Sequence, residues 1–553
     1  MTADAIGSPR GAAEPPVEVD AIVVGAGFAG LYAVHRLRGL GLSVQGFEQG
    51  DDVGGTWYWN RYPGARCDVE SLDYSYSFSP ELEQEWVWTE RYPTQPEILR
   101  YLQHVADRFD LRTAFAFGAR VTSAAFDEAS GRWVVESAAG HRCAATYLIA
   151  AVGCLSARKD PDFEGLGDFA GAWYHTAAWP QEGVDFTGKR VAVVGTGSTG
   201  IQVIPQIARQ AEHLTVLQRT PNFSIPAQNR PLTADVQDEL KARYREHREA
   251  ARTSAFGVPV EPNPKSAFEV TPEEQRRELG ARWNYGGGTA TLLAFSDLLI
   301  DERANEVAAE FVREKIRATV ADERVAEMLC PTDHPIGTKR ICVDISYYET
   351  YNRDNVTLVD VRRDPIERMT ASGLALAGGQ ELELDAIVFA IGFDAMTGAL
   401  FDMNITGRDG RLLEDKWADG PVTHLGLMSA GFPNLFLITG PGSPSVLSNM
   451  VVSIEQHVEW VTDLIAHAQR HGFDVVEPTE EAERAWCEHC AEVAGMTLFP
   501  RARSWYTGQN IPGKPFVLMP YVGGVGVYRE ACDRVAAEGY EGLAFSGTGV
   551  RAA

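Results

Sequence analysis

Residues 21–30 read Ala-Ile-Val-Val-Gly-Ala-Gly-Phe-Ala-Gly, a short apolar strand pattern that runs directly into Gly-x-Gly-x-x-Gly. A helical pattern follows over residues 31–40, so the stretch predicts a strand, a tight turn and a helix in succession. Gly25, Gly27 and Gly30 would let the backbone turn sharply and approach a pyrophosphate, whose charge the N-terminus of the helix then meets. The spacing therefore predicts a dinucleotide-binding fold.

A carboxylate follows the next predicted strand, residues 43–47. Glu48 lies eighteen positions after Gly30, an offset at which an acidic side chain can accept hydrogen bonds from a ribose diol. The first turn therefore suits FAD or NAD, and not NADP.

A second copy of the turn occupies residues 195–200, Gly-Thr-Gly-Ser-Thr-Gly, between a strand pattern at 189–194 and a helical pattern at 201–211. Here Arg219 lies nineteen positions past Gly200, so a cation replaces the carboxylate of the first copy. A guanidinium can bind a phosphate through two hydrogen bonds, whereas a carboxylate would repel it. The second turn therefore predicts NADP binding through its 2'-phosphate.

Composition limits the class of protein and its partners. With 553 residues the chain exceeds one compact core, and roughly two to four domains are expected. A formal net charge of −26 argues against a nucleic-acid partner, which usually requires a basic footprint. No apolar run is long enough to cross a bilayer, and residues 1–18 lack the pattern of a signal peptide. We expect no membrane partner and a cytoplasmic location.

The eight cysteines are scattered, so reduced thiols are expected. Cys487 and Cys490 form the only Cys-x-x-Cys, inside the predicted helix 480–494, and no second pair completes a zinc site. No metal is predicted.

Three further stretches carry a family resemblance. Residues 169–179 fit Phe-x-Gly-x-x-x-His-x-x-x-Trp, residues 54–68 contain Gly-Gly-x-Trp and Tyr-Pro-Gly-x-x-x-Asp, and residues 337–340 read Gly-Thr-Lys-Arg. With the two turns, this set resembles the type I Baeyer-Villiger monooxygenases over nearly the whole chain. The resemblance implies an α/β fold with two Rossmann-like dinucleotide-binding domains, one for FAD and one for NADP, and a helical insertion.

The expected domains are discontinuous. They are an FAD-binding domain (1–155 and 390–553, the second part with a mobile loop), an NADP-binding domain (156–224 and 334–389) and the helical insertion (225–333).

The resemblance also implies roles for single residues. Arg340 and Asp68 are the expected catalytic residues, with Asp68 orienting the arginine. Lys339 is expected on the NADP 2'-phosphate, and Trp505 on a mobile lid that touches the bound nucleotide. The expected cofactor-binding residues are Gly25, Gly27, Gly30, Glu48, Gly55, Thr56, Trp57, Asp68, Tyr74, Gly195, Gly197, Ser198, Thr199, Gly200, Gln202, Arg219, Thr220, Lys339, Arg340 and Trp505.

The implied reaction inserts one oxygen atom of O2 beside a ketone carbonyl at the expense of NADPH, through a flavin C4a-peroxide, and yields an ester or lactone. Arg340 would stabilise the peroxide and the oxyanion that follows it. The partners expected are a small-molecule ketone and O2, with the protein a monomer or weak homo-oligomer. The ketone class, whether cyclic, aryl, aliphatic or steroid, stays open.

Two other functions stay open: a flavin monooxygenase that oxidises nitrogen or sulfur, and an NADPH oxidase without oxygen insertion. Trp179 favours the ketone, because enzymes of the nitrogen- and sulfur-oxidising class usually carry another aromatic residue there. A disulfide reductase would need a cysteine pair beside the flavin, and Cys67 stands alone. His175 is interpreted as an anchor of the segment between the two nucleotide domains, with Gly171 supplying backbone freedom.

Two local predictions can be checked directly. Thr94-Gln95-Pro96-Glu97 predicts a capping box before a helix over 98–109. Within the insertion, Phe311 and Val312 lie on the apolar face of a predicted helix, and Arg313 is expected to face away into solvent.

Overall fold

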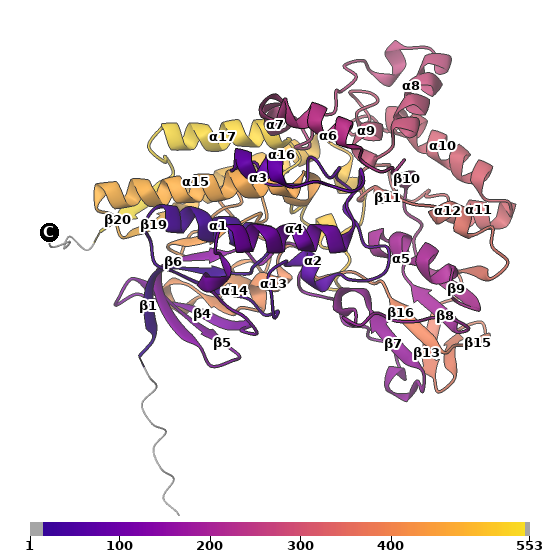
Figure 1. Ribbon diagram of the computed structural model, residues 1–553, viewed down its shortest axis with the longest axis horizontal. Helices are drawn as coiled ribbons and strands as arrows, with labels where there is room; N and C mark the ends of the chain where they lie inside the picture. The colour runs from indigo at the N-terminus through magenta and orange to yellow at the C-terminus, as the bar shows by residue number, and fades with distance from the viewer. Residues whose placement is uncertain (1–14, 548–553) are drawn as a thin grey trace, which may run out of the picture.

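The computed structural model describes residues 15–547, and its architecture is built on two mainly parallel sheets that lie side by side (Figure 1). The first sheet has eight strands in the order β17-β4-β5-β6-β1-β2-β3, and β18 also pairs with β6. Its strands are β1 (Val17–Val24), β2 (Val44–Phe47), β3 (Phe115–Ala116), β4 (Val121–Asp127), β5 (Arg132–Ser137), β6 (Arg142–Ala150), β17 (Ile405–Thr406) and β18 (Leu435–Leu437). β1 lies between β6 and β2 with all three parallel, so the first glycine turn leaves the carboxyl edge of the sheet.

The second sheet has five parallel strands in the order β12-β9-β8-β16-β7. Its strands are β7 (Ala172–His175), β8 (Arg190–Val194), β9 (His213–Gln218), β12 (Val356–Asp360) and β16 (Ala386–Phe389). Smaller sheets join β13 (Ile366–Thr370), β14 (Gly373–Leu376) and β15 (Glu381–Glu383); β10 (Ser224–Pro226) and β11 (Cys342–Asp344); and β19 (Val475–Pro478) and β20 (Leu543–Ser546). Each large sheet is assembled from two separate stretches of chain, and the predicted α/β class is confirmed.

Seventeen α-helices lie within residues 15–547. They are α1 (Phe28–Gly39), α2 (Thr56–Trp59), α3 (Pro80–Glu85), α4 (Gln95–Arg108), α5 (Ser198–Ala208), α6 (Ala234–Lys241), α7 (Tyr244–Thr253), α8 (Pro272–Tyr285), α9 (Gly288–Leu292), α10 (Glu302–Thr319), α11 (Glu323–Leu329), α12 (Tyr347–Thr350), α13 (Gly398–Phe401), α14 (Leu413–Lys416), α15 (Met450–His471), α16 (Glu480–Gly495) and α17 (Val525–Ala537). Each glycine turn leads into a helix, as predicted, but α1 and α5 begin inside the turns, at Phe28 and Ser198, three residues before the predicted starts at 31 and 201.

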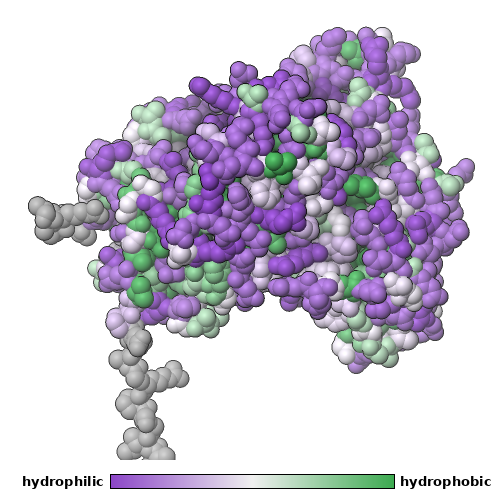
Figure 2. All heavy atoms as spheres, viewed as in Figure 1, coloured by the Kyte–Doolittle hydropathy of each residue, from purple (hydrophilic) through white to green (hydrophobic). Residues whose placement is uncertain are grey.

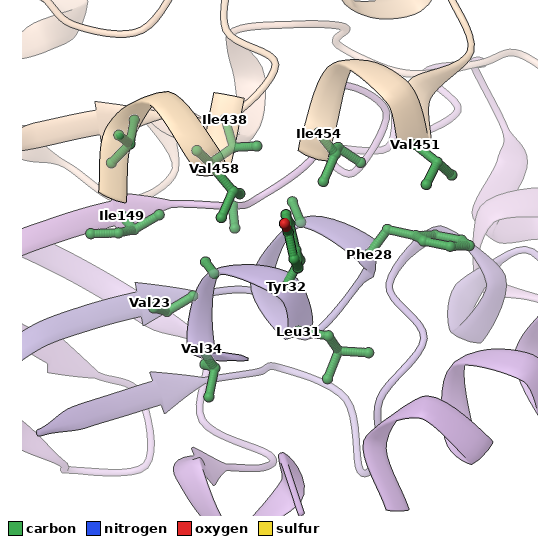
Figure 3. Close-up of a cluster of buried hydrophobic side chains, with 14 of the residues drawn as sticks. Val23, Phe28, Leu31, Tyr32, Val34, Ile149, Ile438, Val451, Ile454 and Val458 are labelled. Atoms are coloured by element: carbon green, nitrogen blue, oxygen red, sulfur yellow. The ribbon is translucent and has the colours of Figure 1, made fainter. Parts of the chain in front are cut away.

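The core beneath the first turn lies between the sheet and the long helix α15. Figure 3 shows Tyr32 of α1 pointing towards α15, where Ile454 and Val458 face it, while Val23 and Ile149 approach from the strands. All five side chains are buried, and full burial of each aliphatic one contributes about 1.5–3 kcal/mol. α1 is therefore held from two sides, which fixes the turn at its N-terminus.

The predicted insertion is helical: α8 to α11 lie at the upper right of Figure 1, and α6 and α7 lie at its top centre, with α7 next to α17. One prediction within it is wrong: Arg313 of α10 is buried and does not face solvent. Its Nε donates to Glu310 at 2.8 Å, it forms an ion pair with Glu306, and an Nη donates to the Pro331 carbonyl at 3.1 Å. These acceptors satisfy the charge, so it can lie against α11.

The predicted capping box before α4 is also wrong. Thr94 occupies the N-cap position, but its side chain accepts no hydrogen bond from the helix. The Glu97 carboxylate accepts instead from the backbone N–H of Thr89 at 2.8 Å and from the Thr89 hydroxyl at 2.9 Å. A contact eight positions away therefore replaces the local one.

The face of the molecule in Figure 2 is dominated by hydrophilic residues, with hydrophobic ones scattered among them. Within residues 15–547, no helix combines the length and the apolar character that a membrane span requires. Cys487 and Cys490 lie in α16 as predicted, and both are free thiols.

Candidate functional site

A cavity of about 1100 Å³ runs from the first glycine turn to the start of α5. It is lined by parts of β1, β2, the 54–69 loop, the segment after β6, and the chain near Arg340. The predicted site residues on its wall are Gly25, Gly27, Glu48, Gly55, Thr56, Trp57, Asp68, Tyr74, Ser198, Thr199, Gln202, Arg340 and Trp505. Residues far apart in sequence therefore meet around one space. Gly30, Gly195, Gly197, Gly200, Arg219, Thr220 and Lys339 lie off this wall.

The first turn is shaped by close backbone contacts. Gly25 has φ of +104°, and a Cβ there would lie 2.5 Å from the Ala151 carbonyl oxygen. A Cβ at Gly30 would lie 1.7 Å from the Gly25 oxygen, and one at Gly27 only 3.3 Å from the Gly55 Cα. The turn and the 54–69 loop thus form a narrow backbone cradle, which fits the pyrophosphate of a dinucleotide such as FAD.

Glu48 directly follows β2 and reinforces this turn. Its buried carboxylate accepts from the backbone N–H of Ala26 at 2.7 Å and of Gly50 at 2.8 Å. Burial raises the pKa of Glu48, and these hydrogen bonds oppose the rise. The side chain also borders the cavity, so its unshared lone pairs remain available to a ribose.

The second turn repeats the geometry of the first. Gly195 has φ of +108°, and a Cβ there would lie 2.5 Å from the Ala390 oxygen, while one at Gly200 would lie 2.2 Å from the Gly195 oxygen. Nothing lies within 4 Å of a Cβ at Gly197, which leaves room for a ligand to approach. The Thr196 hydroxyl donates to the Thr220 carbonyl at 2.9 Å and so ties the turn to the end of β9, next to the exposed Arg219.

The structure brings Asp68 and Arg340 together. Arg340 Nε donates to Asp68 Oδ2 at 3.1 Å, and an Arg340 Nη donates to the Val446 carbonyl at 2.8 Å. Burial raises the pKa of Asp68, and the charge of Arg340 opposes this rise. Burial alone would lower the pKa of Arg340, but the attraction of Asp68 and its neighbours outweighs it, so the pKa of Arg340 is raised. Asp68 Oδ1 is buried without a partner among the described residues. The result is an oriented, permanent cation at the cavity wall.

Tyr506 is a neighbour of this pair that the sequence analysis missed. It is buried, it borders a second, smaller cavity together with Arg340 and Lys339, and it lies within electrostatic range of the Arg340 guanidinium. Burial raises the pKa of Tyr506 to about 12, and Arg340 opposes the rise. Its place directly after Trp505 was the only available signal.

Three predicted binding residues, Gln202, Trp57 and Tyr74, already have protein partners. The Tyr62 hydroxyl donates to Gln202 Oε1 at 2.8 Å, and Gln202 Nε2 donates to the Arg66 carbonyl at 3.1 Å. Gln202 of α5 therefore joins the second sheet to the 54–69 loop. On the other side of that loop, Trp57 Nε1 donates to the Tyr74 hydroxyl at 3.3 Å.

His175 has both ring nitrogens occupied. Nδ1 accepts from the Ala177 backbone N–H at 3.0 Å, so Nε2 carries the proton and donates to the Lys159 carbonyl at 3.0 Å. Burial lowers the pKa of His175, which favours this neutral form. His175 is thus an anchor, as interpreted. Gly171 has another role than backbone freedom: it has no left-handed φ, and a Cβ there would lie 2.7 Å from the Asp385 carbonyl oxygen.

The Trp505 segment is packed in this structure. Trp505 lies on the large cavity with its ring centroid 4.3 Å from that of Tyr506. Beyond it, Asn510 donates to the Phe393 carbonyl at 2.7 Å, and Lys514 pairs with Asp394. Trp505 and Tyr506 pack in an apolar cluster with Phe499 and Met519, whereas the contacts of Asn510 and Lys514 are polar. A stretch held by polar contacts opens locally more readily than a packed core.

We predict that this segment becomes more ordered when the nucleotide binds. Backbone hydrogen exchange across residues 503–513 should slow when NADP+ is added to the FAD-loaded protein, because Trp505 then gains a contact. Mass spectrometry of peptides from this region measures the change, with peptides of α15 as the internal control. Equal exchange with and without NADP+ would contradict a lid.

The chain is similar to several proteins of known function over almost its whole length. Residues 19–272 match the family model described as pyridine nucleotide-disulphide oxidoreductase. A Baeyer-Villiger monooxygenase of Pseudooceanicola batsensis is 46% identical, with 95% of this chain and 96% of that protein covered. A phenazine N-monooxygenase of Lysobacter antibioticus is 43% identical, with 95% of this chain and 96% of that protein covered. The structure of an oxidized steroid monooxygenase bound to NADP is 55% identical, with a TM-score of 0.92, and 96% and 99% covered.

Proposed function

This chain belongs to the family of FAD-dependent Baeyer-Villiger monooxygenases, and from that premise we propose that it uses NADPH and O2 to convert a ketone into an ester or lactone. The observation that carries the proposal is the partly buried Asp68–Arg340 pair on the wall of the cavity that both glycine turns reach. A non-oxygenating NADPH oxidase would need the two turns but not this oriented cation.

FAD, when bound, accepts a hydride from NADPH and activates O2, and the chain's residues provide the setting for both. The first turn and Glu48 hold FAD, while the second turn with Arg219 and Lys339 holds the nicotinamide nucleotide. Arg340 stabilises the oxyanion that forms when the ketone carbonyl is attacked. Asp68 aims the guanidinium, and the Val446 carbonyl fixes one of its amino groups.

We extend the proposal to the organisation of the chain. The FAD-binding domain comprises 1–155 and 390–553, the NADP-binding domain 156–224 and 334–389, and the insertion 225–333. Two strand pairings support this discontinuous arrangement. β16 of the second NADP-binding stretch pairs with β8 of the first, and β18 of the second FAD-binding stretch pairs with β6 of the first. A monomer or weak homo-oligomer is proposed, and sedimentation velocity over a range of concentrations tests it.

Product stoichiometry tests the reaction. With cyclic, aryl, aliphatic and steroid ketones supplied in turn, at least one should yield about one ester or lactone per NADPH consumed, as an insertion reaction requires. Gas chromatography or mass spectrometry measures the product, and a peroxidase-coupled assay measures hydrogen peroxide. Peroxide as the sole product with every ketone would contradict the proposal.

The runner-up function is oxygenation of nitrogen, which the likeness to a phenazine N-monooxygenase favours. An aromatic N-heterocycle such as phenazine is therefore included in the same panel. An N-oxide formed in place of any ester would select this second function.

A further inference from the structure

Three cations from separate stretches of chain gather at the carboxyl edge of the second sheet. Lys159 lies in the segment between β6 and β7, Arg219 directly follows β9, and Lys339 follows the helical insertion. Within residues 15–547, none of the three forms an ion pair or a side-chain hydrogen bond, in a chain with 76 acidic residues. Among the described residues, no carboxylate therefore lies within ion-pair distance of any of the three.

Arg219 lies within electrostatic range of each of the two lysines. Burial lowers the pKa of Lys159, and repulsion from Arg219 lowers it further, against the attraction of Asp162. Burial also lowers the pKa of Lys339, with Arg219 repelling it and Asp333 opposing the shift. Arg219 is thus the shared neighbour. Like charges held together without carboxylate partners form a site for an anion with more than one charge.

The backbone of Lys159 is fixed on both sides. Its N–H donates to the Gly392 carbonyl at 3.1 Å, and its carbonyl accepts from His175 Nε2 at 3.0 Å. The preceding residue, Arg158, forms an isolated antiparallel bridge with Phe393. Lys159 is therefore presented from a rigid backbone position, and less backbone entropy is lost when it binds a ligand than would be lost from a free loop.

We propose that Lys159 is a third cation for the 2'-phosphate of the nicotinamide nucleotide and so helps the protein to select NADP over NAD. The inference rests on the proposed binding of that nucleotide at the second turn. It extends the site beyond Arg219 and Lys339 to a residue that belongs to no sequence motif. It also links His175 to nucleotide binding, because the hydrogen bond from His175 holds the backbone of Lys159 in place.

The test measures nucleotide binding without turnover. In the oxidised, FAD-loaded protein at low ionic strength, Lys159→Ala should raise the Kd for NADP+ roughly tenfold or more, as expected for a lost charge-assisted contact. The Kd for NAD+ should change less than about twofold, because NAD+ lacks the phosphate. Lys159→Arg should bind NADP+ nearly as well as the unaltered protein. Isothermal titration calorimetry gives all these constants.

Lys189→Ala is the matched control. Lys189 directly precedes β8, at the opposite edge of the same parallel sheet, so this variant removes an equal charge away from the site. It should leave the Kd for NADP+ unchanged. Equal losses from the two variants, or equal losses of NADP+ and NAD+ in Lys159→Ala, would overturn the inference and indicate a long-range or structural effect.

The outcome is separable from that of the proposed function. Selective loss of NADP+ binding in Lys159→Ala supports the inference even if no ketone in the panel yields an ester. Conversely, ester formation by the unaltered enzyme together with unchanged NADP+ binding in Lys159→Ala would uphold the reaction and overturn the role of Lys159.

Discussion

Arg340→Ala should still bind FAD and should still lose its yellow colour when NADPH is added without oxygen, yet ester formation should fall by about 10²–10³-fold or more. The guanidinium is held by Asp68 and by the Val446 carbonyl at the cavity wall, where it faces developing negative charge and not a neutral hydride acceptor. NADPH consumed in the presence of oxygen should appear as hydrogen peroxide. Anaerobic absorbance changes measure the first half of the cycle, and product analysis measures the second.

Two companion variants separate charge from shape. Arg340→Lys keeps a cation but loses the planar fork that contacts two acceptors at once, so an intermediate loss of ester formation is expected. Asp68→Asn keeps the side-chain volume and leaves Arg340 charged but poorly oriented. Flavin reduction should therefore persist, and ester formation should fall less than in Arg340→Ala. FAD content and thermal unfolding check that each variant is folded, since removing one partner of a partly buried ion pair destabilises the fold. Ester formation by Arg340→Ala at the unaltered rate would show that another group does this work.

The two glycine turns were predictable because their chemistry is local. A turn that requires positive φ at Gly25 or Gly195, and a Cβ-free residue at Gly30 or Gly200, constrains residues within six positions of each other. The approach of Asp68 to Arg340 spans 272 positions and was implied only by the family resemblance, because no local spacing encodes it.

The errors show where local patterns fail. Glu97 was expected to cap its own helix, but Thr89 offers two donors to the same carboxylate. Arg313 was expected in solvent, but two glutamates and the Pro331 carbonyl satisfy it in a buried position. In both cases a tertiary partner outweighs the helical pattern.

Lys159 and Tyr506 were missed because no local pattern marks them. Neither belongs to a motif. Each is recognised as a site residue only because the fold places it near a cation distant in sequence, Arg219 for the lysine and Arg340 for the tyrosine. A single lysine in a loop, or a tyrosine in an aromatic turn, has no distinguishing mark in one sequence.

The double variant Arg219→Ala/Lys339→Ala should weaken NADPH binding by about 10²–10⁴-fold while changing NADH binding little. Each side chain would lose a charge-assisted contact worth roughly 1.5–3 kcal/mol, and the exposed Arg219 is expected near the lower end because solvent screens its charge. Neither cation has an ion pair with the described part of the chain, so their removal leaves no carboxylate unpaired and FAD binding should persist. Titration of the oxidised enzyme with each nucleotide, together with anaerobic reduction rates, measures the loss. If NADH binding fell as far as NADPH binding, the two side chains would be supporting the fold of the second turn, and the assignment of the 2'-phosphate to them would be wrong.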